Sequence, residues 1–338
     1  MPRPPAPLPD DLGASFRVTR ATSLGATRGR LTARDLHAPF RGVRTRVASQ
    51  ESSHLAGLDD LDVTTPQRLD DAARRALLSR IEAHALVLPT GGFYIGDAAL
   101  ALLGLPFVDP VRAAEHDLEM GVFTPQRASR RTGVDCVQIR EGLAHTTQRG
   151  GFPVATPASV WALLGRRMEV RDLVRIGDAI VRVPRDERGR RRPEHQLATP
   201  AQLTAAIEAG RRLGAARLRA ALPLVRTGSM SVLETDWRLG LVGSGLPEPL
   251  LDVEVRDARG RLLGISDGAF PEFRVAVEIE GDHHRTTRRQ WTRDLDKYAA
   301  YAAIGWDVVR IASSHIRPAR GADVQLVRNA LVRRGWVQ

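Results

Sequence analysis

The sequence predicts a multidomain α/β (α+β) protein, and three observations support this class. The chain has 338 residues, more than one ordinary hydrophobic core accommodates. Threonine caps the first free N–H groups of a helix and proline fits its first turn, which marks helix starts at Thr65-Pro66, Thr156-Pro157 and Thr199-Pro200. The C-terminal third reads as helix, three strands, helix and strand, which is typical of a mixed sheet flanked by helices.

The composition is that of an ordinary globular protein, with 43% hydrophobic and 26% charged residues. Cys136 is the single cysteine, which excludes a disulfide within the chain and favours a cytoplasmic location. No stretch approaches the ~18–20 apolar residues of a membrane span, so we expect no membrane partner. Residues 1–10, "MPRPPAPLPD", lack the apolar segment of a signal peptide and predict a disordered, proline-rich tail.

The chain is strongly basic, with a formal net charge of +11 and a pI near 11.1. Almost all of the positive charge is arginine, since Lys297 is the single lysine. Arginine neutralises phosphates and releases counterions, so the charge favours DNA as a partner. The alternative is a bias from a GC-rich genome, which also enriches alanine, glycine and proline.

Residues 11–50 are expected to form a winged helix-turn-helix. The pattern predicts a helix near Thr19–Leu24, a turn at Gly25, a second helix near Thr27–Asp35 and a strand near Gly42–Val47. Arg28, Arg30 and Arg34 on the second helix would face phosphates or base edges. The alternative is a solvated helical hairpin that packs on the next domain.

Residues 51–225 predict a mixed α/β middle region without the spacing of a metal site or of a nucleophile with its base. A helix is expected at Asp97–Leu103, and "DLVRIGDAIVRVP" is interpreted as a helix end or strand around a Gly-Asp turn. The segment "PRDERGRRRPEH" predicts a solvated linker, with phosphate contact as the alternative. The histidines of this region are interpreted as surface or satisfied residues: His54, His84, His116 and His145.

The pattern of residues 226–338 predicts the mixed sheet and its flanking helices. An amphipathic helix begins after a Ser231 cap and has Glu234 in its first turn. A hairpin turns at Asp257–Gly260 and is followed by a strand at Arg274–Glu280. The next helix has an apolar stripe and ends at Gly305, before the final strand "WDVVRIA". The stripe consists of Trp291, Leu295, Tyr298 and Ala302.

Three carboxylates are expected to meet at one end of this sheet. Asp267 ends the second hairpin strand, and Glu278 and Glu280 share a face of the next strand because side chains alternate. Mg²⁺ or Mn²⁺ prefers such oxygen ligands and would activate water toward a phosphodiester. His283 and His284 follow the strand, and either would shuttle a proton or hold the phosphate. The alternatives are a solvated acidic face and, less favoured, a Zn²⁺ site with Asp282.

The C-terminal segment resembles the DUF559 domain, of the very-short-patch-repair-like branch of the PD-(D/E)xK nuclease superfamily. The resemblance covers about a third of the chain and depends on an ordered set of residues. The set comprises Asp267, Glu278 with Glu280 and Gly281, His284, Asp294 with Lys297, Gly305 with Trp306, and Arg310. The preceding "SVLETDWRLGLVGSGLP" is similar to the leading helix of the family, which implies that Glu234 and Arg238 approach the site.

Two positions depart from the family pattern. Glu280 stands where the superfamily usually has lysine and the family commonly has aspartate, so it can bind a metal but cannot supply positive charge. Lys297 stands where the family often has arginine. We therefore do not assign Lys297 the role of the missing lysine, and a surface ion pair with Asp294 or Asp296 is an equal interpretation.

The front of the chain resembles, more loosely, the winged-helix start of AbiEi-type antitoxins. The similar stretches are "VTRATSLGATRGRLTARDLHAPFRGV" and, in the middle region, "PASVWALLGRRMEVRDLVRIGDAIVR". The resemblance implies DNA binding and a defence or toxin–antitoxin context, with a cognate toxin as a further partner. It implies no reaction.

The favoured function is a metal-dependent DNA endonuclease in defence, repair or a toxin–antitoxin system, with a homodimer as one expected state. Asp267 and Glu278 would hold Mg²⁺ or Mn²⁺, with Glu280 assisting and Glu234 nearby. His284 would act as acid, base or phosphate contact. The residues expected to contact DNA are Arg28, Arg30, Arg34, Arg238, Lys297 and Arg310. The alternative is a non-catalytic DNA-binding regulator with an inactive nuclease fold.

Overall fold

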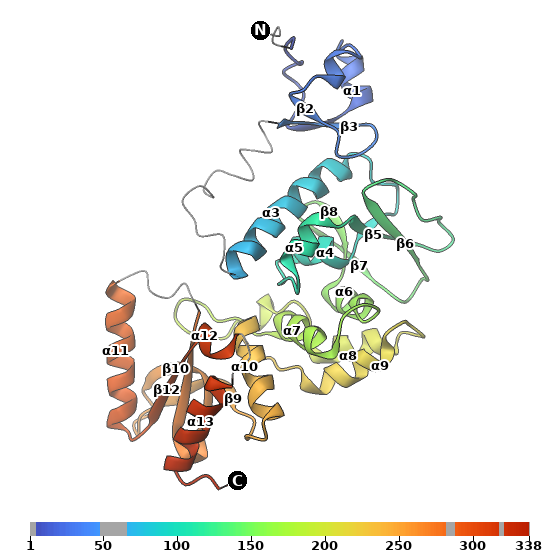
Figure 1. Ribbon diagram of the computed structural model, residues 1–338. Coiled ribbons are helices and arrows are strands. Elements are labelled where there is room, and N and C mark those ends of the chain that lie inside the picture. Colours follow the sequence, from blue (N-terminus) through green and yellow to red (C-terminus); the bar gives the residue numbers. More distant parts are fainter. Residues whose placement is uncertain (1–4, 48–65, 282–287, 318–320, 338) are drawn as a thin grey trace. The chain divides into compact units, whose positions relative to one another are not determined.

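The computed structural model describes residues 5–47, 66–281, 288–317 and 321–337 (Figure 1). Within these residues the fold is mixed α/β with three sheets, which confirms the predicted class. In the described part of the chain, every helix is too short or too polar to cross a bilayer.

The chain forms two compact units, and each is discontinuous in sequence. The first unit comprises Met1–Met168 and Ala201–Leu218, and the second comprises Glu169–Pro200 and Arg219–Gln338. This division differs from the predicted boundary at 225/226. The segment Glu169–Pro200, which the sequence placed in the middle region, belongs with the C-terminal sheet.

The first unit begins with a small three-stranded sheet, which we call with its connections the N-terminal module (residues 12–47). Its elements are β1 (Ser15–Arg17), α1 (Val18–Ser23), β2 (Leu36–His37) and β3 (Val43–Arg46), with antiparallel strands in the order β1-β3-β2. Helix α1 ends at Ser23, and the predicted turn follows at Gly25, whose φ of +89° is the left-handed conformation that favours glycine. The Ala26 N–H then closes the turn on the Ala21 carbonyl.

The second predicted helix, Thr27–Asp35, does not form. Only a 3-10 turn at Arg30–Thr32 is present there. The Thr27 hydroxyl accepts the Arg30 N–H, and the Thr32 hydroxyl donates to the Gly29 carbonyl. These side chains therefore form hydrogen bonds with backbone groups that would otherwise pair within a helix. The module therefore has no helix that would correspond to the predicted reading helix.

The rest of the first unit is built on a five-stranded sheet with the order β6-β5-β4-β8-β7. The strands are β4 (Phe93–Tyr94), β5 (Leu118–Phe123), β6 (Val134–Ile139), β7 (Thr146–Arg149) and β8 (Phe152–Ala155). The helices are α3 (Pro66–Ala85), α4 (Gly96–Leu103), α5 (Pro110–Glu115), α6 (Pro157–Leu164), α8 (Pro200–Glu208) and α9 (Ala215–Ala221), whose last residues belong to the second unit. The three Thr-Pro pairs are each followed by a helix, and α4 confirms the predicted Asp97–Leu103 helix.

The second unit contains the predicted order of helix, three strands, helix and strand. These are α10 (Val232–Gly243), β9 (Leu250–Arg256), β10 (Leu262–Phe270), β11 (Val275–Glu280), α11 (Arg288–Ala303) and β12 (Asp307–Ala312). The unit is completed by α7 (Val170–Val181), α12 (Ser313–Ile316) and α13 (Ala322–Arg333). The sheet order is β12-β11-β10-β9, with β11 and β12 parallel and the other pairs antiparallel.

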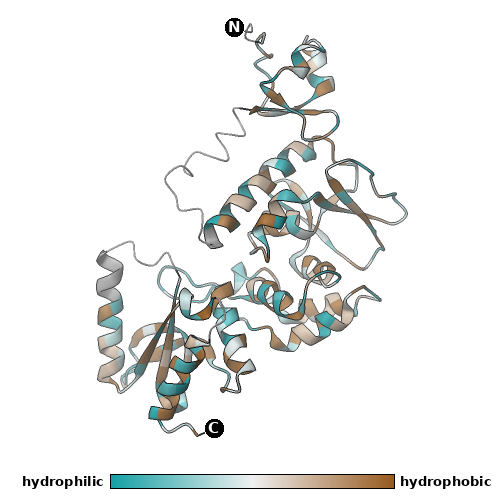
Figure 2. Ribbon diagram, viewed as in Figure 1, coloured by the Kyte–Doolittle hydropathy of each residue, from teal (hydrophilic) through white to brown (hydrophobic). Residues whose placement is uncertain are grey.

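Two clusters of apolar side chains cover the faces of this sheet. On one face, Trp237 and Leu241 of α10 pack with Val275 and Val277 of β11 and with residues of α13. On the other face, Tyr301 of α11 packs with Ala276 and Val255. Figure 2 shows the resulting pattern, with hydrophobic strands between helices of mixed polarity. The alternating strand residues thus supply both layers of the core.

Two predictions fail within this unit. Residues "DLVRIGDAIVRVP" form no turn, because α7 continues through Gly177 and Asp178 to Val181. The apolar stripe predicted for α11 is also displaced. Among the described side chains of this helix, Tyr301 is the fully buried one, whereas Leu295 is 45% exposed.

Candidate active site

Asp267 lies where the main-chain pairing of β10 and β11 stops. The antiparallel pairing joins Gly268–Phe270 with Val275–Val277. One step beyond it, Asp267 Oδ2 accepts the backbone N–H of Ile279 at 2.6 Å. A carboxylate thus occupies the place of a main-chain acceptor, which fixes its position relative to β11.

Glu278 is a buried carboxylate with one paired and one unpaired oxygen. Lys297 Nζ donates to Glu278 Oε2 at 2.7 Å and to the Ile265 carbonyl at 2.6 Å. Glu278 Oε1 is buried without a hydrogen-bond partner among the described residues. The Ser266 hydroxyl lies near enough to lower the pKa of Glu278, yet it donates to the Tyr301 hydroxyl at 3.2 Å. An unpaired buried oxygen is costly, which indicates a site built for a further partner.

The pKa of Glu278 is raised to about 7. Burial is the largest cause, the Lys297 charge opposes it, and the Asp267 charge adds to it. The opposing effects of Lys297 and Asp267 place both charges close to the Glu278 carboxylate. Lys297 therefore pairs with Glu278, in place of the surface pair with Asp294 or Asp296 that the sequence had left open.

Glu234 is a third carboxylate near Asp267. It follows the predicted Ser231 cap of α10, whose hydroxyl accepts the Glu234 N–H at 3.2 Å. Its side chain is buried, and Oε2 accepts the Met230 N–H at 2.7 Å. Burial, and after it the Asp267 charge, raise the pKa of Glu234 to about 8. Asp267 therefore lies near both Glu234 and Glu278.

The three predicted metal ligands are not brought together. Glu280 accepts Arg310 Nε at 2.6 Å, and the Arg310 guanidinium also lies 5.3 Å from the centre of the Tyr298 ring. Among the described residues, no group of three or more His, Cys, Asp or Glu side chains has the arrangement of a metal site. Asp267 and Glu278 still fit a Mg²⁺ ion held by two carboxylates, since this ion keeps several waters and Glu278 Oε1 lacks a partner.

The segment that follows β11 contains other predicted site residues. Asp282, His283 and His284 lie outside the described residues. Their predicted role as acid, base or phosphate contact therefore stays a prediction.

The residues predicted to bind DNA divide into two groups. Arg28 and Arg34 are exposed. Arg30 instead forms two hydrogen bonds with Asp35, at 2.9 and 2.6 Å, and its side chain is 8% exposed. Arg30 and Arg310 are therefore engaged by carboxylates.

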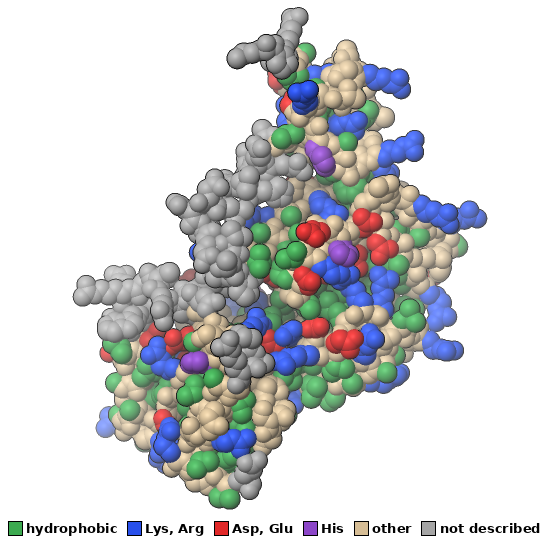
Figure 3. Space-filling view, in the orientation of Figure 1, with side chains coloured by type: hydrophobic (Ala, Val, Ile, Leu, Met, Phe, Trp, Pro, Cys, Tyr) green, Lys and Arg blue, Asp and Glu red, His purple; other side chains and the backbone are tan. Residues whose placement is uncertain are grey.

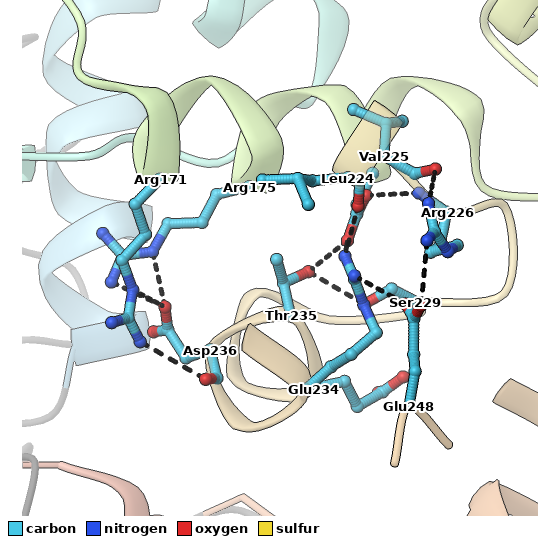
Figure 4. A network of polar contacts seen from close by, with 12 residues as sticks. Arg171, Arg175, Leu224, Val225, Arg226, Ser229, Glu234, Thr235, Asp236 and Glu248 are labelled. Atoms are coloured by element: carbon cyan, nitrogen blue, oxygen red, sulfur yellow. Dashed lines mark hydrogen bonds and ion pairs between the residues drawn. The ribbon is translucent and has the colours of Figure 1, made fainter. Parts of the chain in front are cut away.

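Arg238 does not face the surface. Its side chain is 1% exposed and forms ion pairs with Asp178 at 2.9 Å and Glu248 at 3.1 Å. Asp178 also accepts the Thr235 hydroxyl and the Arg226 N–H. Figure 4 shows Thr235, Arg226 and Glu248 in this network. These contacts join α7 to α10 and indicate a structural role for Arg238 in place of the predicted contact with DNA.

Asp236, which the sequence analysis did not single out, holds three arginines. It is buried, and it accepts Arg175 Nε at 2.7 Å, Arg317 Nε at 2.9 Å and Arg171 Nε at 3.3 Å. Figure 4 shows Arg171 and Arg175 reaching from α7 toward Asp236. The signal in the sequence was an aspartate on the inward face of an amphipathic helix, where an unpaired charge would be costly.

The arginine-rich segment 184–195 is docked on the sheet. Arg185 Nε donates to Asp252 Oδ1 at 2.6 Å, and Arg191 Nε donates to Asp252 Oδ2 at 3.0 Å. Asp252 is a buried residue of β9 with a φ of +52°, which is unusual for a residue other than glycine. This segment, predicted as a solvated linker, is instead part of the second unit.

Comparisons with known proteins assign no activity. No protein-family model matches the chain, and no solved structure matches it. Two similar proteins are the uncharacterised proteins MT2308 and Rv2248 of Mycobacterium tuberculosis, strains CDC 1551 / Oshkosh and H37Rv. Each is 30% identical over 112 residues, which are 33% of this chain and 41% of the relative. The chain thus spans less than half of the length of these relatives.

Proposed function

We propose that the second unit is a metal-dependent DNA endonuclease that hydrolyses a phosphodiester bond. The observation that carries the proposal is the Glu278 carboxylate. One of its oxygens is neutralised by Lys297, and the other is buried without a partner among the described residues, in the field of Asp267. The resemblance to DUF559 nucleases, in the ordered residues around this carboxylate, is the second support.

Asp267 and Glu278 would hold the Mg²⁺ or Mn²⁺ ion. The ion, when bound, polarises the phosphodiester and lowers the pKa of water. Asp267 is fixed by the Ile279 N–H, so its carboxylate needs little reorganisation. Lys297 supplies positive charge at the site from α11, which compensates for the glutamate at position 280.

Glu234 is suited to proton transfer in this proposal. Its pKa of about 8 makes it largely protonated at neutral pH, and its place on α10 is fixed by the Met230 N–H. A protonated carboxyl can donate to a leaving oxygen. His284 remains a second proposed acid, base or phosphate contact.

A non-catalytic DNA-binding regulator is the second candidate. The observation that favours it is the ion pair of Glu280 with Arg310, which removes one predicted ligand from the site. In that case the sheet would serve as a body for assembly or for clamping DNA. A homodimer and a cognate toxin belong to this candidate and to the endonuclease alike.

The test is cleavage of supercoiled, linear, mismatched and single-stranded DNA in Mg²⁺ or Mn²⁺. We expect the wild type to nick DNA, and both Asp267→Asn and Glu278→Gln to lose nicking while they still bind DNA. Glu272→Gln is the matched control, because Glu272 is exposed on the turn between β10 and β11. Wild-type protein that binds every substrate and cleaves none would make the regulator the better function.

A parallel measurement detects metal binding without an activity assay. A ligand that binds only the folded state raises the melting temperature. Mg²⁺ or Mn²⁺ should therefore raise the melting temperature of the wild type and of Glu272→Gln, but not that of Glu278→Gln.

A further inference from the structure

Two short segments of the first unit are strongly basic. The N-terminal module contains eight arginines and one aspartate, a net charge of +7. The β5–β6 loop (residues 124–133) contains three arginines and no carboxylate, a net charge of +3. Together the two segments carry +10 of the chain's +11, so the rest of the chain is nearly balanced.

The fold places these two segments side by side. Arg131 of the β5–β6 loop donates from Nη1 to the Arg41 carbonyl at 2.6 Å, across 90 residues of sequence. A Cβ at Gly133 would lie 3.5 Å from the Phe40 ring, so the loop end also contacts the turn before β3. The two basic segments therefore form one surface.

Some arginines of this surface hold the module together, and others are exposed. Arg30 is bound to Asp35, Arg44 Nε donates to the Leu31 carbonyl and Arg46 Nη2 donates to the Leu12 carbonyl. The exposed arginines are Arg17, Arg20, Arg28, Arg34, Arg41, Arg127 and Arg130. Within the described residues no carboxylate forms an ion pair with these seven. Figure 3 shows Lys and Arg side chains projecting along one edge of this unit.

A nearby carboxylate does not neutralise this surface. Asp135, the second residue of β6, lies 3.7 Å from Arg166, and Arg166 also faces Glu119. The seven exposed guanidiniums therefore repel each other, and this repulsion is relieved by a partner with closely spaced negative charges. Guanidinium groups match phosphate oxygens in geometry as well as charge.

The surroundings favour nucleic acid over an anionic membrane. A surface that inserts into lipid needs large apolar side chains beside its basic residues. The exposed large apolar residues of the described chain all lie outside the two basic segments. The module also has no second helix to enter a groove, since Thr27–Asp35 forms only a 3-10 turn. Contacts from such a surface reach phosphates and leave the base edges unread.

We propose that the N-terminal module and the β5–β6 loop form one surface that binds the phosphate backbone of duplex DNA without sequence preference. The inference rests on the proposed function for its choice of DNA. It adds Arg127 and Arg130, from a loop outside the N-terminal module, to the DNA-binding residues. Arg131 is a positioning residue that holds this loop on the module.

The test is fluorescence anisotropy with the full chain and two duplexes of unrelated sequence, over a range of salt concentration. Arg127→Gln/Arg130→Gln should weaken binding to both duplexes alike, about 10-fold at low salt, and reduce the salt slope by about 1.8. The matched control is Arg259→Gln/Arg261→Gln, which removes two exposed arginines from the β9–β10 turn. The control should keep the affinity within about 2-fold, and circular dichroism should show both variants folded.

Three results would overturn the proposal. Equal affinities of the two double variants would remove the β5–β6 loop from the surface. A strong preference for one duplex would show that bases are read. Tighter binding to phosphatidylserine vesicles than to DNA, lost in Arg127→Gln/Arg130→Gln, would make a membrane the partner. The endonuclease proposal can fail independently. A chain that binds DNA through these arginines but never nicks it would reject the endonuclease and still support the proposed DNA-binding surface.

Discussion

The Lys297 ammonium lies 2.7 Å from Glu278 Oε2, so the single lysine of the chain neutralises a buried carboxylate at the candidate site. The pair joins α11 to β11 across 19 residues of sequence. Lys297 also donates to the Ile265 carbonyl, which fixes its ammonium between two strands. The lysine is therefore oriented before any substrate arrives.

Replacing Lys297 should separate a role at the site from a role in DNA binding. Lys297→Ala should reduce nicking by about 100-fold, because a fixed charge at the reacting phosphate is lost. Affinity for DNA and its salt dependence should change little, since the ammonium faces Glu278. The measurement is nicking beside anisotropy on the same preparations, with Lys297→Arg as the charge-preserving control. A drop in affinity with a salt slope lower by about 0.9 would instead support the predicted phosphate contact.

The stability that Glu234 and Glu278 contribute to the metal-free protein should fall as pH rises. Burial raises the pKa of Glu234 to about 8 and that of Glu278 to about 7, above the ordinary value of 4.5. Between pH 4.5 and 8 the folded state therefore binds protons that the unfolded state has released. Their contribution is full below about pH 4.5 and is lost through this window, by at most about 1.4 kcal/mol per pH unit for each group. Urea unfolding at several pH values with a chelator measures this slope.

Variants identify the carboxyl groups that cause this pH dependence of stability. Glu234→Gln should flatten the pH dependence, whereas Glu272→Gln should leave it unchanged because Glu272 is exposed. The comparison with Glu234→Gln cancels the opposite contribution of the buried His84, whose pKa is lowered to about 4 by burial. A wild-type stability that does not fall relative to that of Glu234→Gln over this window would contradict the burial of Glu234 as an acid.

Arg238→Ala should destabilise the second unit severely. It leaves the buried Asp178 carboxylate without its cation, a change that costs about 3–5 kcal/mol for buried pairs. Asp178→Asn/Arg238→Ala should recover part of the loss, because the orphaned charge is gone. Thermal unfolding of the three variants measures this recovery. Normal stability with weakened DNA binding would restore the role that the sequence predicted.

Gly96→Ala should destabilise the first unit through a steric conflict. Gly96 has a φ of +55°, and a Cβ there would lie 1.9 Å from Glu119 Oε2. That oxygen accepts the Asp97 N–H at 2.7 Å and faces Arg167 at 3.1 Å, so it cannot easily move. The matched control is Gly104→Ala, with a φ of +69° and an open space around its Cβ. Thermal unfolding should show a loss about 1–3 kcal/mol larger for Gly96→Ala than for the control.

The C-terminal sheet was predictable because its signals are local. The Ser231 cap, the Asp257–Gly260 turn and the alternation in Arg274–Glu280 each fix an element from neighbouring residues. The resemblance drew attention to Asp267 and Glu278, and in the structure the two carboxylates are close enough for the Asp267 charge to raise the pKa of Glu278. Their use of a metal stays a prediction.

The failures arose where a distant partner decides the structure. Asp178 was read as a turn residue because glycine precedes it, but Arg238 lies 60 residues away and stabilises the helix through Asp178. A surface ion pair of Lys297 with Asp294 or Asp296 was left open because both aspartates are close in sequence, whereas its partner Glu278 lies on another element. Glu280 was assigned to the metal by its face of the strand, but it pairs with Arg310 of β12, which the register places opposite Glu278.

The discontinuity of the second unit has a consequence for synthesis on the ribosome. Helix α7 emerges first, yet its partner Arg238 follows Asp178 by 60 residues, and the chain completes part of the first unit in between. At about 5–20 residues per second, α7 waits about 3–12 s with its buried aspartate uncompensated. During that interval the unpaired helix α7 is a substrate for a chaperone that holds unfolded segments. A fragment that starts at residue 226 lacks α7 altogether.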